Sequence, residues 1–186
     1  MTVQLQRHTF TVDDYHRMLE AGILTEDDRV ELICGEIIAM APIGSRHATC
    51  VDGFNELLGE SLRRRAVVRV QNPITIGESS EPQPDISLAR PPRSRYAAAH
   101  PTPPDVFFVV EVSDTTILFD REMKLPLYAK AGIPEVWIVD LTARRVETYR
   151  DPTPYGYREP RYLYLGDTLS PAAFPDVTLK VDEVLG

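Results

Sequence analysis

Apolar residues in the middle of the chain follow the two-residue period of buried strands. In segment 107–113 one face carries Phe107, Val109, Glu111 and Ser113, and the other carries Phe108, Val110 and Val112. Both faces are apolar for most of their length, as in a central strand that is covered on both sides. Segment 83–88 predicts a second strand, with Asp85 and Ser87 on one face and Ile86 and Leu88 on the other.

Each of these two strands carries one acidic side chain. A carboxylate inside a buried strand costs on the order of several kcal/mol unless a cation or a set of donors meets it. If the strands pair with their polar faces on the same side, Asp85 and Glu111 converge. Two converging carboxylates repel each other, and a divalent metal ion is the usual remedy.

Three other segments have the 3.6-residue spacing of helices. The first begins at Thr11, a suitable N-cap, and Gly22 ends it. The second begins with Ser45 as its cap and runs to about Arg65. Its shared face carries His47, Val51, Phe54 and Leu58.

The third predicted helix covers residues 115–131 and is ended by Gly132 and Pro134. Pro126 lies inside it and should bend the helix or break it into two pieces. This helix follows the central strand and returns across the sheet. Asp120, Lys124 and Tyr128 lie on one side of it, at positions i, i+4 and i+8.

The remaining segments predict short strands. Residues 30–40 form a hairpin around Cys34 and Gly35, and residues 67–70 form a strand that can continue past Pro73 into 74–76. Further strands are expected at 135–140 and 145–150, an edge hairpin at 155–164, and a short strand with one helical turn at 177–185. This order predicts one α/β domain over residues 1–186, a mixed β-sheet flanked by helices with extra antiparallel hairpins.

The composition indicates the class of protein. The 186 residues are 43% apolar and 26% charged, as in an ordinary globular protein. No run approaches the roughly 20 apolar residues of a membrane span, and no signal-peptide pattern opens the chain, so no membrane contact is expected. Cys34 and Cys50 form no metal-ligand spacing, and we interpret them as reduced thiols of a cytoplasmic protein.

The formal charge of −8 argues against broad, non-specific nucleic-acid binding by the whole surface. A local basic groove remains open, because seven arginines gather in the middle of the chain: Arg63, Arg64, Arg65, Arg69, Arg90, Arg93 and Arg95. These arginines either contact phosphates or form a solvated face. The proline-rich connection 90–104 has no core pattern and is a candidate wall of a substrate cleft.

Asp85, Glu111 and Lys124 form the candidate catalytic set. Two carboxylates, with a backbone carbonyl and waters, can hold Mg²⁺ at about 2.0–2.1 Å. Such a metal lowers the pKa of a bound water and neutralises charge on a phosphate in the transition state. A lysine beside it positions the water or stabilises the developing charge. The trio therefore indicates metal-assisted hydrolysis.

The motifs in their order resemble those of the PD-(D/E)XK nuclease superfamily, and more closely the Uma-two family of restriction-endonuclease-like proteins. The matching stretches are Val30 to Ile37, Gln83-Pro84-Asp85-Ile86, Val110 to Ser113, Asp120 through Lys124 to Ala129, and Ala131 to Asp140. Together they span most of the chain, from about Phe10 to Leu185.

This resemblance implies a restriction-endonuclease-like core in which Asp85 and Glu111 bind Mg²⁺ or Mn²⁺. The superfamily pattern places a lysine two residues after the glutamate, where this chain has Ser113. In the family the lysine role moves into the following helix, which makes Lys124 the catalytic candidate. Glu31 and His47 match recurrent family positions and are expected at the rim of the site, with Asp120 and Tyr128 as further rim candidates. The implied substrate is DNA rather than RNA, cut by a homodimer.

Other interpretations stay open. Asp85 after Pro84 suits a turn, His47 suits a hydrogen-bonded core histidine, and Tyr128 suits packing. Glu31 is otherwise a solvated or cross-strand-paired acid, and Glu111 with Lys124 is otherwise a buried ion pair. The main alternative function is a catalytically weak or silent module on the same fold that binds nucleic acid or another protein. A structural ion-pair core without any ligand is the third.

Overall fold

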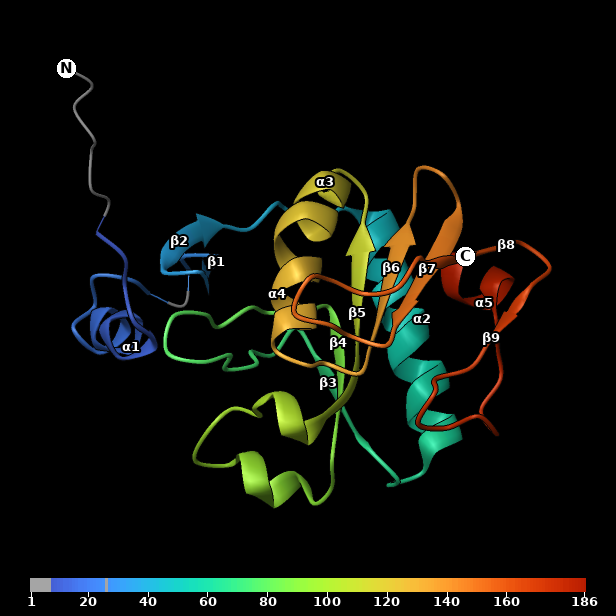
Figure 1. Ribbon diagram of the computed structural model, residues 1–186, viewed down its shortest axis with the longest axis horizontal. Coiled ribbons are helices and arrows are strands. Elements are labelled where there is room, and N and C mark those ends of the chain that lie inside the picture. Colours follow the sequence, from blue (N-terminus) through green and yellow to red (C-terminus); the bar gives the residue numbers. More distant parts are fainter. Residues whose placement is uncertain (1–7, 26) are drawn as a thin grey trace.

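A six-stranded mixed sheet forms the centre of the computed structural model, which describes residues 8–25 and 27–186 (Figure 1). Its strand order is β3-β4-β5-β6-β7-β8, and only β5 and β6 run parallel to each other. The strands are β3 (Val67–Val70), β4 (Ile86–Ala89), β5 (Val106–Ser113), β6 (Glu135–Asp140), β7 (Arg145–Arg150) and β8 (Arg161–Tyr164). The predicted α/β class and the mixed sheet are confirmed.

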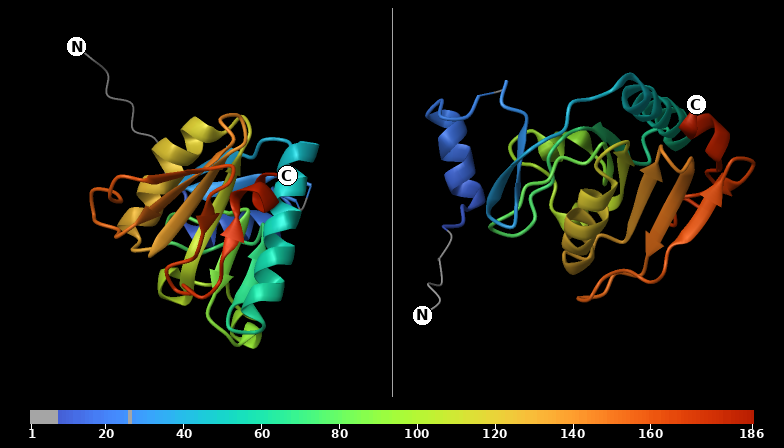
Figure 2. Two further views of the ribbon diagram at one scale, coloured as in Figure 1. Left: turned by 90° about the vertical axis from the view of Figure 1, so that its right-hand side faces the viewer. Right: turned by 90° about the horizontal axis from the view of Figure 1, so that it is seen from above.

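Helices cover the two faces of this sheet, as the two views of Figure 2 show. On one face α2 (Ser45–Leu62) and α5 (Val181–Leu185) pack on a core that contains Phe54, Phe108 and Trp137. On the other face α4 (Leu125–Lys130) packs on a smaller core with Val109 and Ile138. Residues of β5 alternate between the two cores, so β5 is the doubly covered strand that its apolar pattern predicts.

The connection from β5 to β6 is one helical rod with a widened turn inside it. It consists of α3 (Ile117–Phe119), the π-helical turn η3 (Asp120–Lys124) and α4, in which Pro126 is at an N-terminal position. Proline lacks an N–H group and is tolerated in the first turn of a helix. The π turn ends two residues before Pro126, and the helical segments on either side of it are contiguous, so the helix changes its hydrogen-bonding pattern there without separating into two pieces.

The N-terminal elements lie beside the sheet, next to segment 74–85 (Figure 1). They are α1 (Val12–Glu20), with Thr11 as N-cap in a capping box, and the hairpin β1 (Val30–Ile33) and β2 (Glu36–Ala39). Cys34 and Gly35 both have positive φ, which is the conformation of a type I′ hairpin turn. Hydrogen bonds from the Glu81 N–H to the Leu32 carbonyl and from the Gly35 N–H to the Ser79 carbonyl attach the hairpin.

Several predicted boundaries were wrong. Gly44, not Ser45, is the N-cap of α2, and α2 ends at Leu62 because Arg63 adopts a left-handed conformation. Strand β3 ends at Val70 and does not continue into 74–76. Connection 90–104 contains two 3₁₀ helices, η1 (Arg93–Tyr96) and η2 (Pro103–Asp105).

In the tail, β8 is an edge strand of the main sheet, and β9 (Thr168–Leu169) pairs with β10 (Leu179–Lys180) ahead of α5. The predicted short strand and helical turn near the C-terminus are confirmed. Among the described helices, none combines the length and the apolar character that crossing a membrane requires.

Candidate functional site

A cavity of about 640 Å³ opens where β4 begins and β5 ends. We call it the carboxylate cleft. Four acids and one lysine form its floor: Glu31, Asp85, Glu111, Asp120 and Lys124. Segments 38–44 and 114–119 supply residues to its walls, and Arg29 and His47 also line it. The site therefore combines side chains from β1, β5, the residue before β4, and the helical rod after β5.

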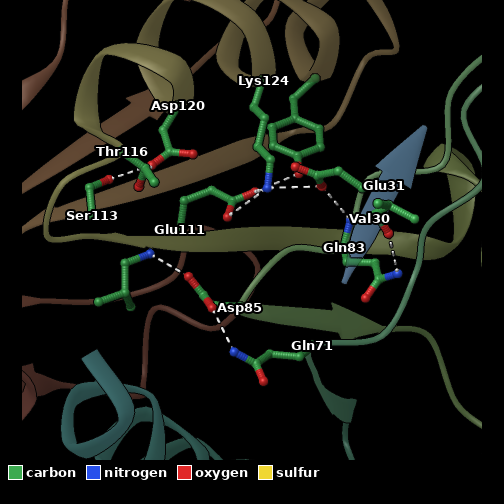
Figure 3. A network of polar contacts seen from close by, with 12 residues as sticks. Val30, Glu31, Gln71, Gln83, Asp85, Glu111, Ser113, Thr116, Asp120 and Lys124 are labelled. Carbon is green, nitrogen blue, oxygen red and sulfur yellow. Dashed lines mark hydrogen bonds and ion pairs between the residues drawn. The ribbon is translucent and has the colours of Figure 1, made fainter. Parts of the chain in front are cut away.

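Lys124 lies between two buried glutamates (Figure 3). Its Nζ atom is 3.1 Å from Oε2 of Glu31 and 3.3 Å from Oε1 of Glu111. Tyr128 donates its hydroxyl to the same Oε1 of Glu111 at 2.6 Å, and the backbone N–H of Gln83 donates to Glu31 at 3.0 Å. The ammonium group is thus fixed by two carboxylates that are themselves held in place.

Asp85 is held at the neighbouring position by three donors. The register that pairs Ile86 with Val110 places Asp85, one residue earlier, opposite Glu111. Oδ2 of Asp85 accepts the backbone N–H of Val112 at 2.8 Å and is 3.1 Å from Nε2 of His47. Oδ1 accepts from Nε2 of Gln71 at 3.1 Å. Both oxygens therefore have a fixed direction.

Asp120 completes the floor. Its Oδ2 atom accepts from the hydroxyl groups of Ser113 at 2.7 Å and Thr116 at 2.8 Å. Ser113 lies two residues after Glu111, and its hydroxyl fixes a carboxylate on the π turn. One turn of that rod separates Asp120 from Lys124, and one further turn separates Lys124 from Tyr128.

Burial and an excess of negative charge set the protonation of the acids. Burial raises the pKa of Glu111 well above its usual value, because Lys124 only partly offsets it and Asp120, Asp85 and Glu31 add to the rise. Burial likewise raises the pKa of Asp120, although Lys124 and the two hydroxyl donors oppose this. Burial alone would lower the pKa of Lys124, but Glu111, Glu31 and Asp120 outweigh it and raise that pKa.

The pair of Asp85 and His47 behaves differently. Burial alone would raise the pKa of Asp85, but His47, the Val112 N–H and Gln71 together lower it. The hydrogen bond to Asp85 raises the pKa of His47 against the effect of its burial. The surroundings of Asp85 therefore stabilise its charged form, whereas Glu111 shares one ammonium group with Glu31.

The structure brings six of the seven predicted site residues to the lining of one cleft, with changed partners, and Tyr128 is the exception. Lys124 was expected over Asp85 and Glu111; in the described residues its ion pairs are with Glu31 and Glu111. Glu31, expected at the rim, is 3% exposed and lines the cleft, where it pairs with Lys124. Tyr128 is fully buried and hydrogen-bonded to Glu111, so it lies behind the floor.

Sequence reasoning missed three residues. Gln71 and Gln83 contact Asp85 and Glu31, but amides near turns carry no distinctive signal in a single sequence. Gln71 has a positive φ of 49°, a backbone conformation rare for glutamine. Arg29 lines the cleft two residues before Glu31, outside the basic set that the sequence draws attention to.

A metal ion at this site would depend on few protein ligands. Within residues 8–25 and 27–186, no three His, Cys, Asp or Glu side chains are arranged to hold one. Asp85 and Glu111 supply hard oxygen donors on adjacent strands of the same cleft. Mg²⁺ commonly takes one or two carboxylates and keeps several waters, so this donor set fits it.

The sheet is mixed, Asp85 and Glu111 lie on neighbouring chain segments of it, and Lys124 reaches Glu111 from the helical rod. This arrangement is that of a restriction-endonuclease-like α/β fold. The chain belongs to the Uma2 (Uma-two) family, whose model, described as "Putative restriction endonuclease", matches residues 12–182. This membership supports a nuclease-like role.

A solved structure from Anabaena variabilis, titled as a putative nuclease belonging to DUF820, has the same fold. It is 17% identical, with a TM-score of 0.72 over 95% of this chain and 97% of the other. A search of curated proteins found no match.

Proposed function

We propose that this protein is an endonuclease that hydrolyses phosphodiester bonds in DNA with the help of Mg²⁺ or Mn²⁺. The observation that carries the proposal is the charge balance of the carboxylate cleft. Five acids line one cavity whose described lining contains a single lysine. Burial raises the pKa of Glu111, and Asp120, Asp85 and Glu31 add to a rise that Lys124 only partly offsets. A divalent cation at Asp85 and Glu111 would restore the balance.

The bound cation would activate a water and neutralise charge on the phosphate. The residues of the chain have distinct tasks around it. Asp85 and Glu111 hold the cation, and Lys124 orients the attacking water as a fixed point charge. Glu31 fixes Lys124, and Tyr128 fixes Glu111. Such partners behind the ligating groups commonly set ligand orientation.

The wider setting is part of the same proposal. We favour DNA over RNA, and a homodimer, because cutting both strands of a duplex needs two sites. The free thiols of Cys34 and Cys50 fit a cytoplasmic location.

A second candidate function is a nucleic-acid-binding or interaction module with little turnover. The net charge of −8 favours the interaction form of this module over an active duplex-cutting enzyme, because proteins that bind duplexes normally have a dominant basic face. The third interpretation, a structural ion-pair core, requires neither metal nor nucleic acid. The contacts of Lys124 with Glu31 and Glu111 are compatible with it.

Metal binding and cleavage test these functions together. We expect calorimetric titration with Mn²⁺ to show binding that is lost in Asp85→Ala and in Glu111→Ala. Glu122→Gln is the matched control, because Glu122 is exposed on the same rod and does not line the cleft. Plasmid nicking should require Mg²⁺ or Mn²⁺ and fall in the same two variants. Salt-dependent DNA binding without cleavage would establish the binding module instead, and absence of metal and DNA binding would leave the ion-pair core.

A further inference from the structure

The carboxylate cleft faces an electrostatic difficulty if its substrate is a nucleic acid. Its floor is acidic, and a phosphodiester is an anion, so the two repel each other. A bound divalent cation neutralises part of that charge at the reacting phosphate. Holding the strand also requires a cation that is not already committed to an acid of the protein.

Two of the three cationic side chains that line the cleft already have acidic partners, and so does Arg46, which lines a different pocket. Lys124 contacts Glu31 and Glu111, and His47 contacts Asp85 at 3.1 Å. Arg46, at the start of α2, is 3.7 Å from Asp114 and donates to the Leu141 carbonyl at 2.7 Å. Each of these three groups is therefore already partly neutralised by an acid of the protein.

Arg29 is the fourth cation, and it differs from the others. Within the described ranges 8–25 and 27–186 it makes no ion pair, and its guanidinium has one long hydrogen bond, 3.4 Å to the carbonyl of Ala41. It is exposed and lines the cleft beside the wall segment 38–44. Its backbone carbonyl accepts the N–H of Met40 at 2.8 Å, which anchors the residue at the base of the β1–β2 hairpin.

Asp28, the acid next to Arg29 in the chain, is directed elsewhere. Asp28 accepts the backbone N–H and the hydroxyl of Thr25, at 2.8 and 2.9 Å, and so is turned to its own loop. The charge of Arg29 is felt inside the cleft, where it opposes the rise in the pKa of His47. A guanidinium presents a planar fork of donors that matches phosphate oxygens in pairs.

We infer that Arg29 is the strand-binding residue of the cleft, and that its guanidinium, which has no acidic partner among the described residues, binds a phosphodiester group of the nucleic-acid strand. This inference rests on the proposed function for its substrate class and adds the residue that holds the substrate. Lys124, enclosed by Glu31 and Glu111, then serves only the reacting centre. Binding of the strand and chemistry on it are assigned to separate cations.

Binding measured without cleavage tests the inference. The full chain, in EDTA, is titrated into a fluorescent DNA oligonucleotide at several salt concentrations. Arg29→Gln should weaken binding about tenfold and reduce the dependence of log K on log salt by about one unit or slightly less. Arg161→Gln is the control: it removes the same charge from the edge strand β8, where Arg161 is exposed and outside the cleft.

A second arm identifies the contacted group. A set of oligonucleotides with one phosphate each replaced by neutral methylphosphonate should include one that binds wild type more weakly but binds Arg29→Gln like the unmodified strand. Equal losses in both proteins at every position would overturn the inference, as would identical binding by Arg29→Gln and Arg161→Gln. Thermal unfolding of Arg29→Gln should match wild type, because the side chain is exposed.

The two proposals can fail separately. If the protein cuts DNA and Arg29→Gln binds and cuts like Arg161→Gln, the nuclease function stands and the role of Arg29 is wrong. If the protein never cuts DNA but Arg29→Gln loses affinity and salt dependence, the strand-binding role stands and the nuclease function is wrong.

Discussion

Two buried glutamates lie under the same helical rod, and they differ in the number of cations that contact them. Glu147 on β7 is 0% exposed and Glu111 on β5 is 3% exposed. The π turn sends Arg121 to Glu147, with Nε at 3.1 Å from Oε2, and Lys124 to Glu111. Glu147 also receives Nε of Arg145 at 3.0 Å and the hydroxyl of Tyr149 at 2.8 Å.

The difference lies in the charge balance. Glu147 has two guanidinium partners, which form a satisfied network between β7 and the rod. Glu111 shares one ammonium group with Glu31, has Asp85 and Asp120 nearby, and lines an open cleft. A buried acid that is paired with enough cations of the protein contributes to stability. A buried acid that lines a cavity and lacks such partners can instead bind a cation from solution.

The largest expected effect comes from Glu111→Gln. The amide keeps the shape of the side chain but cannot hold a divalent cation, so we expect nicking activity to fall about 1,000-fold or more, or roughly 4 kcal/mol of transition-state stabilisation. The free energy of unfolding at pH 8 without metal should stay the same or rise, because a poorly compensated buried charge is removed. Nicking rates and urea denaturation measure both. Activity near the wild-type level would remove Glu111 from the mechanism.

The matched change at the other glutamate, Glu147→Gln, should have the opposite pattern. It leaves Arg121 and Arg145 with Asp140 as their one remaining shared acid among the described residues, so the free energy of unfolding should fall by about 3 kcal/mol. Nicking at a temperature where the variant stays folded should change less than tenfold. Urea denaturation compared with Glu111→Gln is the measurement. Equal free energies of unfolding for Glu147→Gln and Glu111→Gln would contradict the proposed difference in charge balance between the two glutamates.

Gln71→Ala probes how Asp85 is oriented. Losing the amide donor at 3.1 Å should weaken Mn²⁺ binding about 10- to 100-fold, which is the range for residues that hold a ligand in place. Asn72→Ala is the control, because the neighbouring Asn72 is exposed and its amide donates only to the Val70 carbonyl. Calorimetry on both variants checks this. Equal affinities would show that the Val112 N–H and His47 suffice.

The smallest expected effect is a pH dependence of stability in EDTA. Burial raises the pKa of Glu111 in the folded state well above its ordinary value of 4.5. Between these two pKa values the folded protein therefore binds more protons than the unfolded protein. The contribution of Glu111 to stability is fully present below pH 4.5. It is lost as pH rises through the raised pKa, with a slope of at most about 1.4 kcal/mol per pH unit. The stability difference between Glu111→Gln and wild type should therefore increase in favour of the variant from pH 5 upward. A constant difference would contradict the raised pKa.

Local patterns in the sequence predicted the elements that carry the site. The two-residue period of 107–113 indicated a strand covered on both faces, and the i, i+4, i+8 spacing placed Asp120, Lys124 and Tyr128 on one side of a helix. The order of motifs indicated the family, which the match over residues 12–182 confirms. These features are readable because period and spacing are properties of neighbouring residues.

Contacts between distant segments were decided only in the tertiary structure. The β1–β2 hairpin docks on segment 79–83 and carries Glu31 to Lys124, so Glu31 is a floor residue and Asp85 turns to Gln71 and His47 instead. The pairing of Glu147 with Arg121 and the unpaired state of Arg29 among the described residues have the same origin. Which acid receives which cation depends on how separate elements pack, and no local period encodes that.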